Sequence, residues 1–368
     1  MKPTIFFIGI MVLNLTASSS LIKQNQASLL PEKAFLASSS FQKQRQELVG
    51  LYPIQLNGKM GYMDFTGQVA IAPQFDYADR FVEGLAKVKI NNKWGFISPA
   101  GTIVIKPQFD ETDRFSEGLA LVGIKDRWGF IDKTGKLTIP IQFDFASKFS
   151  QGRAIAMTKK GVGFIDPTGK LVIEPTYFEA RDFSEGLAGV RILKTGFPYD
   201  CCVDPNFWGF VDRSGKEVIP LQFRAVDDFS EGLAAVKIHG KMGYIDQKRK
   251  MVIEPHFDYA GSFSEGLAII KIKEKWGYIN RKGKMVIEPQ FDNASYFSEG
   301  LAGVYIERKS GYIDPTGRLV IKAQFDSAFP FIQGLAEVRV GDREGYIDPS
   351  GKYVWSSQNK KFSRLRRK

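Results

Sequence analysis

The chain has 368 residues and a formal net charge of +11, with only two cysteines and two histidines. These counts exclude an extensive disulfide framework and argue against a histidine-rich metal centre. Six of the positive charges lie between Lys360 and Lys368. Such a segment is either a solvated chain end or a binder of phosphate-bearing polymers and anionic lipid, and we assign residues 356–368 as a basic tail.

The N-terminal residues resemble a secretory signal. Lys2 precedes an apolar run from Ile5 to Leu13, and small polar residues follow up to Ser20. The run is much shorter than the roughly 20 residues of a membrane-spanning helix. We therefore expect residues 1–20 to be a cleaved signal peptide and the mature protein to be secreted or periplasmic. Residues 21–50 lack sustained periodicity and predict a flexible leader.

A repeat dominates the rest of the chain. A marker glycine, preceded in four units by tryptophan, recurs every 34 residues, except for one longer step that implies an insertion of 12 residues within 193–207. This periodicity indicates an array over residues 51–355 and favours a repeat scaffold over an enzyme. The marker glycines are Gly61, Gly95, Gly129, Gly163, Gly209, Gly243, Gly277, Gly311 and Gly345.

Each unit predicts a small antiparallel sheet. In the second unit, Ala86 to Ile90 alternates apolar and polar residues, and Trp94 to Ile97 forms an aromatic-rich strand. The next turn usually reads Asp-x-x-Gly, a sequence suited to a short bulged hairpin loop. We expect a third strand at Ile103 to Ile105, ended by Pro107. Each unit is thus predicted to be a three-stranded meander followed by a loop whose phenylalanines plug the core between units.

Two motifs in fixed order carry a family resemblance. Trp-Gly pairs occur at residues 94–95, 128–129, 208–209 and 276–277, and Phe-Ser-Glu-Gly-Leu-Ala occurs at residues 115–120, 183–188, 229–234, 263–268 and 297–302. With these motifs the chain resembles the WG-repeat family of bacterial proteins. The resemblance implies a β-rich repeat scaffold and brings no catalytic residues. Tryptophan is replaced in five units, which we expect to stack less tightly, by Met60, Val162, Met242, Ser310 and Glu344.

The arrangement of the units has two alternatives. Nine units exceed the usual four to eight blades of a propeller, and no unit is split between the termini to latch a ring. We therefore predict an all-β array of nine three-stranded repeats stacked as an open superhelical solenoid. A closed, β-propeller-like ring is the alternative.

Residues that carry chemistry are few. His239 and His256 have no cysteine or carboxylate at metal-ligand spacing, and the recurrent aspartates sit where hairpin turns begin. We therefore predict no catalytic residue, no metal and no cofactor.

The insertion is the one segment that the repeat does not dictate. It contains Tyr199, the adjacent Cys201 and Cys202, and Phe207. The two thiols have no third partner, so they form a vicinal disulfide, pair between chains or stay free. A long loop on a regular scaffold is often functional, although it can also be a tolerated insertion. We expect it to project from one edge of the array without altering the register of units four and five.

Basic residues recur in two columns along the array. Stacked like charges are unfavourable unless acidic groups or a partner offset them, and the glutamates of the Glu-Gly turns, such as Glu83 and Glu117, are the expected internal offset. The first column precedes the marker pair at Lys59, Lys93, Arg127, Lys241, Lys275, Lys309 and Arg343. The second follows the hairpin glycine position at Lys136, Lys170, Lys216, Lys250, Lys284, Arg318 and Lys352.

These features favour a non-catalytic, secreted or periplasmic scaffold that mediates protein–protein interaction. Tyr199, Phe207 and the first basic column are its candidate binding surface. The alternative is a binder of anionic polysaccharide or another envelope polymer, and an enzyme with its site in the insertion ranks third. We expect no specific nucleic-acid partner and no transmembrane segment after signal cleavage.

Overall fold

The computed structural model describes residues 50–192 and 207–357. The predicted signal, almost all of the leader, most of the insertion and most of the basic tail lie outside these ranges. The described residues contain strands, turns and bends but no helix, as the repeat predicted. Accordingly, no helix suited to crossing a membrane occurs in this part of the chain.

The strands form nine antiparallel sheets, which we call blades 1 to 9 in chain order. Blades 1 to 3 contain β1 (Tyr52–Leu56), β2 (Lys59–Met63), β3 (Val69–Phe75); β4 (Tyr77–Ala78), β5 (Ala86–Ile90), β6 (Lys93–Ile97), β7 (Ile103–Phe109); β8 (Glu111–Thr112), β9 (Leu119–Ile124), β10 (Arg127–Asp132) and β11 (Leu137–Phe143). Blades 4 to 6 contain β12 (Phe145–Ala146), β13 (Ala154–Thr158), β14 (Gly161–Ile165), β15 (Leu171–Tyr177); β16 (Glu179–Ala180), β17 (Leu187–Arg191), β18 (Trp208–Asp212), β19 (Glu217–Phe223); β20 (Ala225–Val226), β21 (Leu233–Ile238), β22 (Lys241–Asp246) and β23 (Met251–Phe257). Blades 7 to 9 contain β24 (Tyr259–Ser264), β25 (Leu267–Ile272), β26 (Lys275–Asn280), β27 (Met285–Phe291); β28 (Asn293–Ala294), β29 (Ala302–Ile306), β30 (Lys309–Ile313), β31 (Leu319–Phe325); β32 (Ser327–Ala328), β33 (Ala336–Val340), β34 (Arg343–Ile347) and β35 (Tyr353–Ser356).

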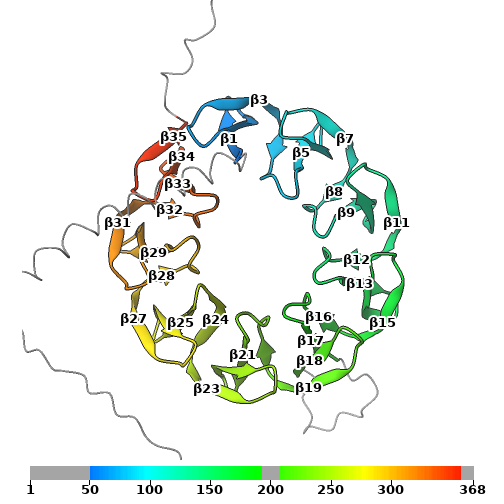
Figure 1. Ribbon diagram of the computed structural model, residues 1–368, viewed down its shortest axis with the longest axis vertical. Coiled ribbons are helices and arrows are strands. Elements are labelled where there is room, and N and C mark those ends of the chain that lie inside the picture. Colours follow the sequence, from blue (N-terminus) through cyan, green and yellow to red (C-terminus); the bar gives the residue numbers. More distant parts are fainter. Residues whose placement is uncertain (1–49, 193–206, 358–368) are drawn as a thin grey trace, which may run out of the picture. The chain divides into compact units, whose positions relative to one another are not determined.

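The blades close into a ring, so the prediction of an open solenoid is wrong and its alternative, a propeller-like ring, is confirmed. Figure 1 shows the blades around a central opening, with blade 9 beside blade 1. Tyr52, Ile54 and Met63 of blade 1 share one buried cluster with Tyr346 and Trp355 of blade 9. The closed ring is more stable than an open stack because an open stack would leave the apolar faces of both end blades in water.

Each blade after the first has four strands rather than the predicted three. The additional strand is a short innermost one, such as β4 or β16, formed by residues that we had placed in the loop (Figure 1). The outermost strand also runs beyond its predicted end: β7 continues through Pro107 to Phe109. Proline is tolerated there because an edge strand has no outer neighbour to which it must donate a hydrogen bond.

The marker glycines are required by a close approach within each blade. A Cβ on Gly129 would lie 2.6 Å from the carbonyl oxygen of Ile139, on the neighbouring outer strand of the same blade. The strand register shifts at this point, which brings the outer backbone over the glycine. The close approach at the marker glycine therefore involves the outer strand of the same blade.

An aromatic pair joins every blade to the next. Phe96 of blade 2 contacts Phe115 of blade 3 with ring centroids 4.8 Å apart, and both side chains are almost fully buried. This confirms that the loop phenylalanines plug the core between units. Equivalent pairs are Tyr62–Phe81, Phe130–Phe149, Phe164–Phe183, Phe210–Phe229, Tyr244–Phe263, Tyr278–Phe297 and Tyr312–Phe331.

Two hydrogen bonds latch the inner ends of neighbouring blades. The Ser116 hydroxyl donates to the Phe149 carbonyl at 2.7 Å, and the Glu117 carboxylate accepts the Gly152 N–H at 2.8 Å. The same serine bond is made by Ser150, Ser184, Ser230, Ser264 and Ser298. The same acceptor role belongs to Glu83, Gln151, Glu185, Glu231, Glu265 and Glu299. These contacts explain why the Ser-Glu-Gly sequence recurs.

The latch holds its glutamate in an unusual backbone conformation. Glu117 has φ of 55° and the following Gly118 has φ of 82°, as a two-residue type I′ turn requires. A left-handed non-glycine residue costs on the order of 1 kcal/mol. The side-chain bond to the next blade offsets this cost.

The junction between blades 9 and 1 uses different residues from the other junctions. One period before Phe81 the sequence has Glu47, which lies outside the described residues, and the aromatic partner of Tyr346 is instead Tyr52, 5.7 Å away. Tyr52 replaces the alanine found at this position in blades 2 to 4, and its hydroxyl donates to the Gln333 carbonyl. The Tyr346 hydroxyl donates to the Pro53 carbonyl at 2.9 Å. The ring therefore closes by packing of enlarged side chains.

The insertion leaves the register of its blade unchanged, as predicted. It connects β17 to β18 at a hairpin tip, where Arg191 pairs with Trp208. This pairing matches that of Lys89 with Trp94 in blade 2.

We expect Gly129→Val to destabilise the protein more than Trp128→Met. The valine must displace backbone, which costs about 3 kcal/mol or more, whereas methionine already stands at the tryptophan position in other blades and should cost about 1 kcal/mol. Thermal melts of the two variants check this order, and the reverse order would refute the close-approach explanation.

We expect Glu265→Ala to lower stability by about 1 kcal/mol, because the Gly300 N–H loses its acceptor. Glu265→Gln should be nearly neutral, since Gln151 makes the same bond naturally at 2.7 Å. Urea unfolding of the two variants measures the difference. Equal midpoints for both would show that the latch contributes no stability.

We expect Tyr52→Ala and Trp355→Ala each to cost about 3 kcal/mol, because both side chains are only 5% exposed and lie in the closing cluster. Hydrogen exchange should then accelerate first in blades 1 and 9. Tyr353→Ala, at a residue 46% exposed, is the control. Uniform acceleration around the ring would contradict a separate closing junction.

Candidate functional site

Six of the seven members of the first basic column are neutralised by the protein itself. Lys93 Nζ lies 2.5 Å from Asp110 Oδ1, an aspartate that begins the next blade. The same pairing joins Lys59 to Asp76, Arg127 to Asp144, Lys241 to Asp258, Lys275 to Asp292 and Lys309 to Asp326. The offsetting acids are therefore these aspartates and not the glutamates that we expected, which bind backbone N–H groups instead.

These ion pairs have a simple electrostatic signature. The hydrogen bond from Lys93 lowers the pKa of the Asp110 carboxyl, and the N–H of Lys125 lowers it further. The pairs are half-exposed, so solvent and salt screen the attraction between the two charges. Lys93, Arg127, Lys241, Lys275 and Lys309 thus link blades rather than form a free cationic surface. Arg343 forms no ion pair within the described ranges and lines a hollow with Phe325 and Tyr353.

The second basic column is exposed. All of its members lie at the start of the outer strands, next to the hairpin turns. The Lys136 N–H, for example, donates to Asp132 Oδ1 at 3.1 Å. Among the described residues only Arg318 of this column forms an ion pair, with Asp314. These side chains remain available to an anionic ligand.

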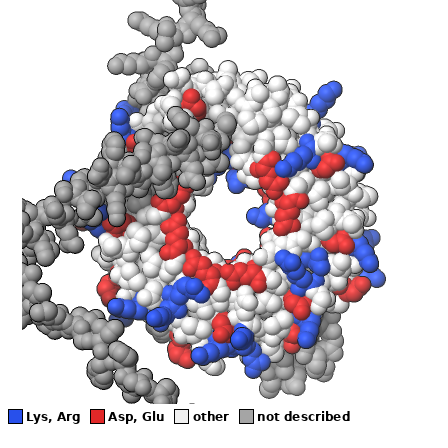
Figure 2. Space-filling model, viewed as in Figure 1, with Lys and Arg blue, Asp and Glu red and all other residues white. Residues whose placement is uncertain are grey.

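The central opening is acidic. The loops between the first and second strands, such as the loop joining β8 to β9, face the centre of the ring in Figure 1. These loops carry the latch glutamates, and Figure 2 shows acidic side chains along the rim of the opening. Their carboxylates already accept backbone hydrogen bonds, so this acidity follows from the latch.

Three of the innermost strands begin with an exposed aromatic residue. Tyr77 begins β4, Phe145 begins β12 and Tyr259 begins β24, and they are 46%, 46% and 40% exposed. Two of them contact the marker tryptophan of their blade, Tyr77 at 5.4 Å from Trp94 and Tyr259 at 5.2 Å from Trp276. The innermost strands therefore present these rings to solvent.

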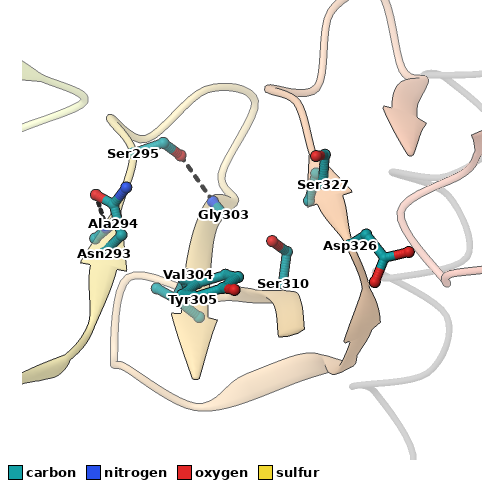
Figure 3. Close-up of a pocket in the computed structure, with 10 residues that line it drawn as sticks. Asn293, Ala294, Ser295, Gly303, Val304, Tyr305, Ser310, Asp326 and Ser327 are labelled. Atoms are coloured by element: carbon teal, nitrogen blue, oxygen red, sulfur yellow. Dashed lines mark hydrogen bonds between the residues drawn. The ribbon is translucent and has the colours of Figure 1, made fainter. Parts of the chain in front are cut away.

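A hollow of about 330 Å³ lies between blades 8 and 9. Figure 3 shows Asn293, Tyr305 and Ser310 of blade 8 facing Ser327 of blade 9 across it. The hollow exists because Ser310 occupies the marker position, where blade 2 has Trp94. Ser310 is itself buried, at 9% exposure.

The polar groups of this hollow are only partly satisfied. The Ser295 hydroxyl accepts the Gly303 N–H at 2.9 Å (Figure 3), and Asp326 binds Lys309 and the Gly341 N–H. Among the described residues, the side-chain hydroxyls of Tyr305, Ser310 and Ser327 have no hydrogen-bond partner. The hollow therefore offers hydroxyl groups and no unpaired charge.

Most of the insertion cannot be compared with its prediction. Tyr199, Cys201 and Cys202 lie outside the described residues. Phe207 is described, and the guanidinium of Arg224 lies 4.6 Å from its ring. The end of the insertion therefore contacts the connection between β19 and β20.

Neither histidine gathers metal ligands. His239 forms part of a hairpin tip with φ of 48°, and His256 Nδ1 lies 2.6 Å from the Glu254 carbonyl. In the ranges that the structure describes, no group of three or more His, Cys, Asp or Glu side chains is placed to hold a metal ion.

Sequence reasoning missed both the exposed aromatic side chains of the innermost strands and the hollow. Tyr77, Phe145 and Tyr259 fell in segments assigned to loops, so their shared position on an innermost strand was not visible. Ser310 was noted as a replaced tryptophan with looser stacking expected. Its combination with the small Gly303 was the available signal for a hollow.

Comparisons with known proteins agree with this architecture. The model of the family described as "WG containing repeat" matches residues 60–94, 94–128, 128–161, 163–194, 208–241, 242–276, 276–309 and 311–343. No curated protein sequence matches the chain significantly.

Solved structures were found that are similar to this chain. A eukaryotic initiation factor is similar at a TM-score of 0.60 and 10% identity, over 83% of this chain and 95% of that one. BamB from Moraxella catarrhalis is matched at a TM-score of 0.42 and 10% identity, over 82% of this chain and 92% of that one. At 10% identity, the similarity to the initiation factor supports the fold alone. The family match, in contrast, covers more than half of the chain in eight stretches between residues 60 and 343, and the chain therefore belongs to the WG-containing repeat family.

Proposed function

We propose that this protein is a non-catalytic, exported scaffold that binds another protein around the central opening of its ring. The observation that carries the proposal is the set of exposed aromatic side chains, Tyr77, Phe145 and Tyr259, on rigid innermost strands. Aromatic residues dominate protein-binding energy because they bury a large area at a small cost in conformational entropy. Residues 1–20, with their signal-like pattern, support export.

Binding of an anionic envelope polymer is a second candidate, favoured by the exposed second basic column. Affinity for such a polymer falls steeply with salt because binding releases counterions. An aromatic protein interface is much less sensitive to salt. Salt dependence therefore separates the two candidates.

We expect the triple variant Tyr77→Ser, Phe145→Ser, Tyr259→Ser to lose partner capture by at least about tenfold, because each ring contributes roughly 1 kcal/mol or more to an interface. The measurement is crosslinking of residues 21–368 in the native envelope, followed by mass spectrometry of the captured protein. Val104→Ser, Val252→Ser, Val286→Ser is the matched control, since these outer-strand valines are 43%, 38% and 40% exposed.

Two outcomes would move the site elsewhere. Loss of capture only when residues 194–205 are deleted would assign recognition to the insertion. Loss only with Lys136→Gln, Lys170→Gln and Lys250→Gln, together with steep salt dependence, would favour the polymer. Either result contradicts the aromatic interface.

A further inference from the structure

The hollow between blades 8 and 9 lies where other blades place the tryptophan of the marker pair, and the backbone around it has the same strand register. In blade 2, Trp94 lies between Lys89 and Phe109 in the strand register. In blade 8, Ser310 lies in the same register between Tyr305 and Phe325. Trp94 is 9% exposed, so its indole fills the corresponding space in blade 2. Because the strands of blade 8 pair in the same register and Ser310 is smaller than tryptophan, that space is open in blade 8.

Neighbouring substitutions do not refill the space. Asn293 occupies the place of Tyr77, and Gly303 occupies the place of Leu121 in blade 3. A Cβ on Gly303 would touch the Ser295 hydroxyl at 3.2 Å and otherwise meet no atom closer than 3.6 Å. The wall is thus built from small residues, and Tyr305 supplies an aromatic ring at its side (Figure 3).

The chemistry of the hollow selects a neutral aromatic group with a donor. Lys309 and Asp326 neutralise each other at 2.6 Å, so no charge attracts an ion. In blade 2 the indole N–H of Trp94 is buried without an acceptor. The hollow instead offers the oxygens of Tyr305, Ser310 and Ser327, which can accept an indole N–H.

We propose that the hollow between blades 8 and 9 binds the indole of a tryptophan side chain from the protein partner. The inference rests on the proposed protein-binding function and supplies its anchor residue. Tryptophan is among the residues most enriched at binding hot spots, where it fills a matching pocket on the other protein. A neutral sugar, which would also use the hydroxyls, is the competing occupant.

Binding of 5-fluoroindole, followed by ¹⁹F NMR on the full mature chain, tests the pocket without the partner. We expect one site with a Kd of about 1 mM or tighter, as for a small fragment in a matching pocket. Ser310→Trp should abolish binding and keep or raise the melting temperature, since it restores the side chain of blade 2. Gly303→Leu, which copies Leu121 of blade 3, should abolish it independently. Trp94→Ser should create a second site.

Three results would overturn the inference. The first is absence of 5-fluoroindole binding to the unmodified chain. The second is unchanged binding in both filled variants. The third is displacement of bound 5-fluoroindole by N-acetylglucosamine but not by indole. The tests remain distinct from those of the proposed function. Loss of partner capture in Ser310→Trp, with the fold intact, supports the tryptophan anchor. Full capture in that variant contradicts the anchor but leaves the proposed protein-binding function unaffected.

Discussion

The structure depends on one repeated contact, the aromatic ring that each blade inserts against an aromatic ring of the preceding blade. A single small sheet cannot bury its own face, so stability comes from these junctions. The contact between Phe96 and Phe115 has almost the same geometry at every regular junction, with ring centroids 4.8 Å apart there and 5.0 Å apart at Tyr244–Phe263. Polar latches stand beside it at the inner end of the blade. Serine and glutamate therefore set how closely neighbouring blades approach near the centre.

This junction uses two of the recurring sets of charge that the sequence displays. The first basic column pairs with aspartates of the next blade, and the latch glutamates accept backbone N–H groups. These two sets therefore connect blades and do not form a free charged surface. The groups left for recognition are the second basic column, the exposed rings of Tyr77, Phe145 and Tyr259, and the hollow at Ser310.

The two residues of the marker pair have different physical roles. The glycine lies under the backbone of its own outer strand, where any Cβ would clash, and so it persists in every blade. The tryptophan fills the groove toward the next blade, and this groove also accommodates other side chains. Variation at this position makes the junctions unequal, and Ser310 opens one of them.

Several features were determined by the sequence alone. The 34-residue spacing predicted nine all-β units, the Asp-x-x-Gly turns predicted the hairpins, and the loop phenylalanines predicted the plugs, because each depends on local backbone geometry or on burial within a short segment. The place of the insertion at a hairpin tip was predictable for the same reason.

Tertiary structure decided the rest. Closure depends on whether blade 9 meets blade 1, which is set by the accumulated angle between all blades and by the packing of Tyr52, Tyr346 and Trp355 across nearly the whole length of the chain. The fourth strand depends on which blade captures the residues after each Phe-Asp pair. The partners of Lys93 and Glu117 lie in the next blade, and the hollow at Ser310 needs walls from two blades. A linear pattern records which residues recur, but only packing determines which of them meet.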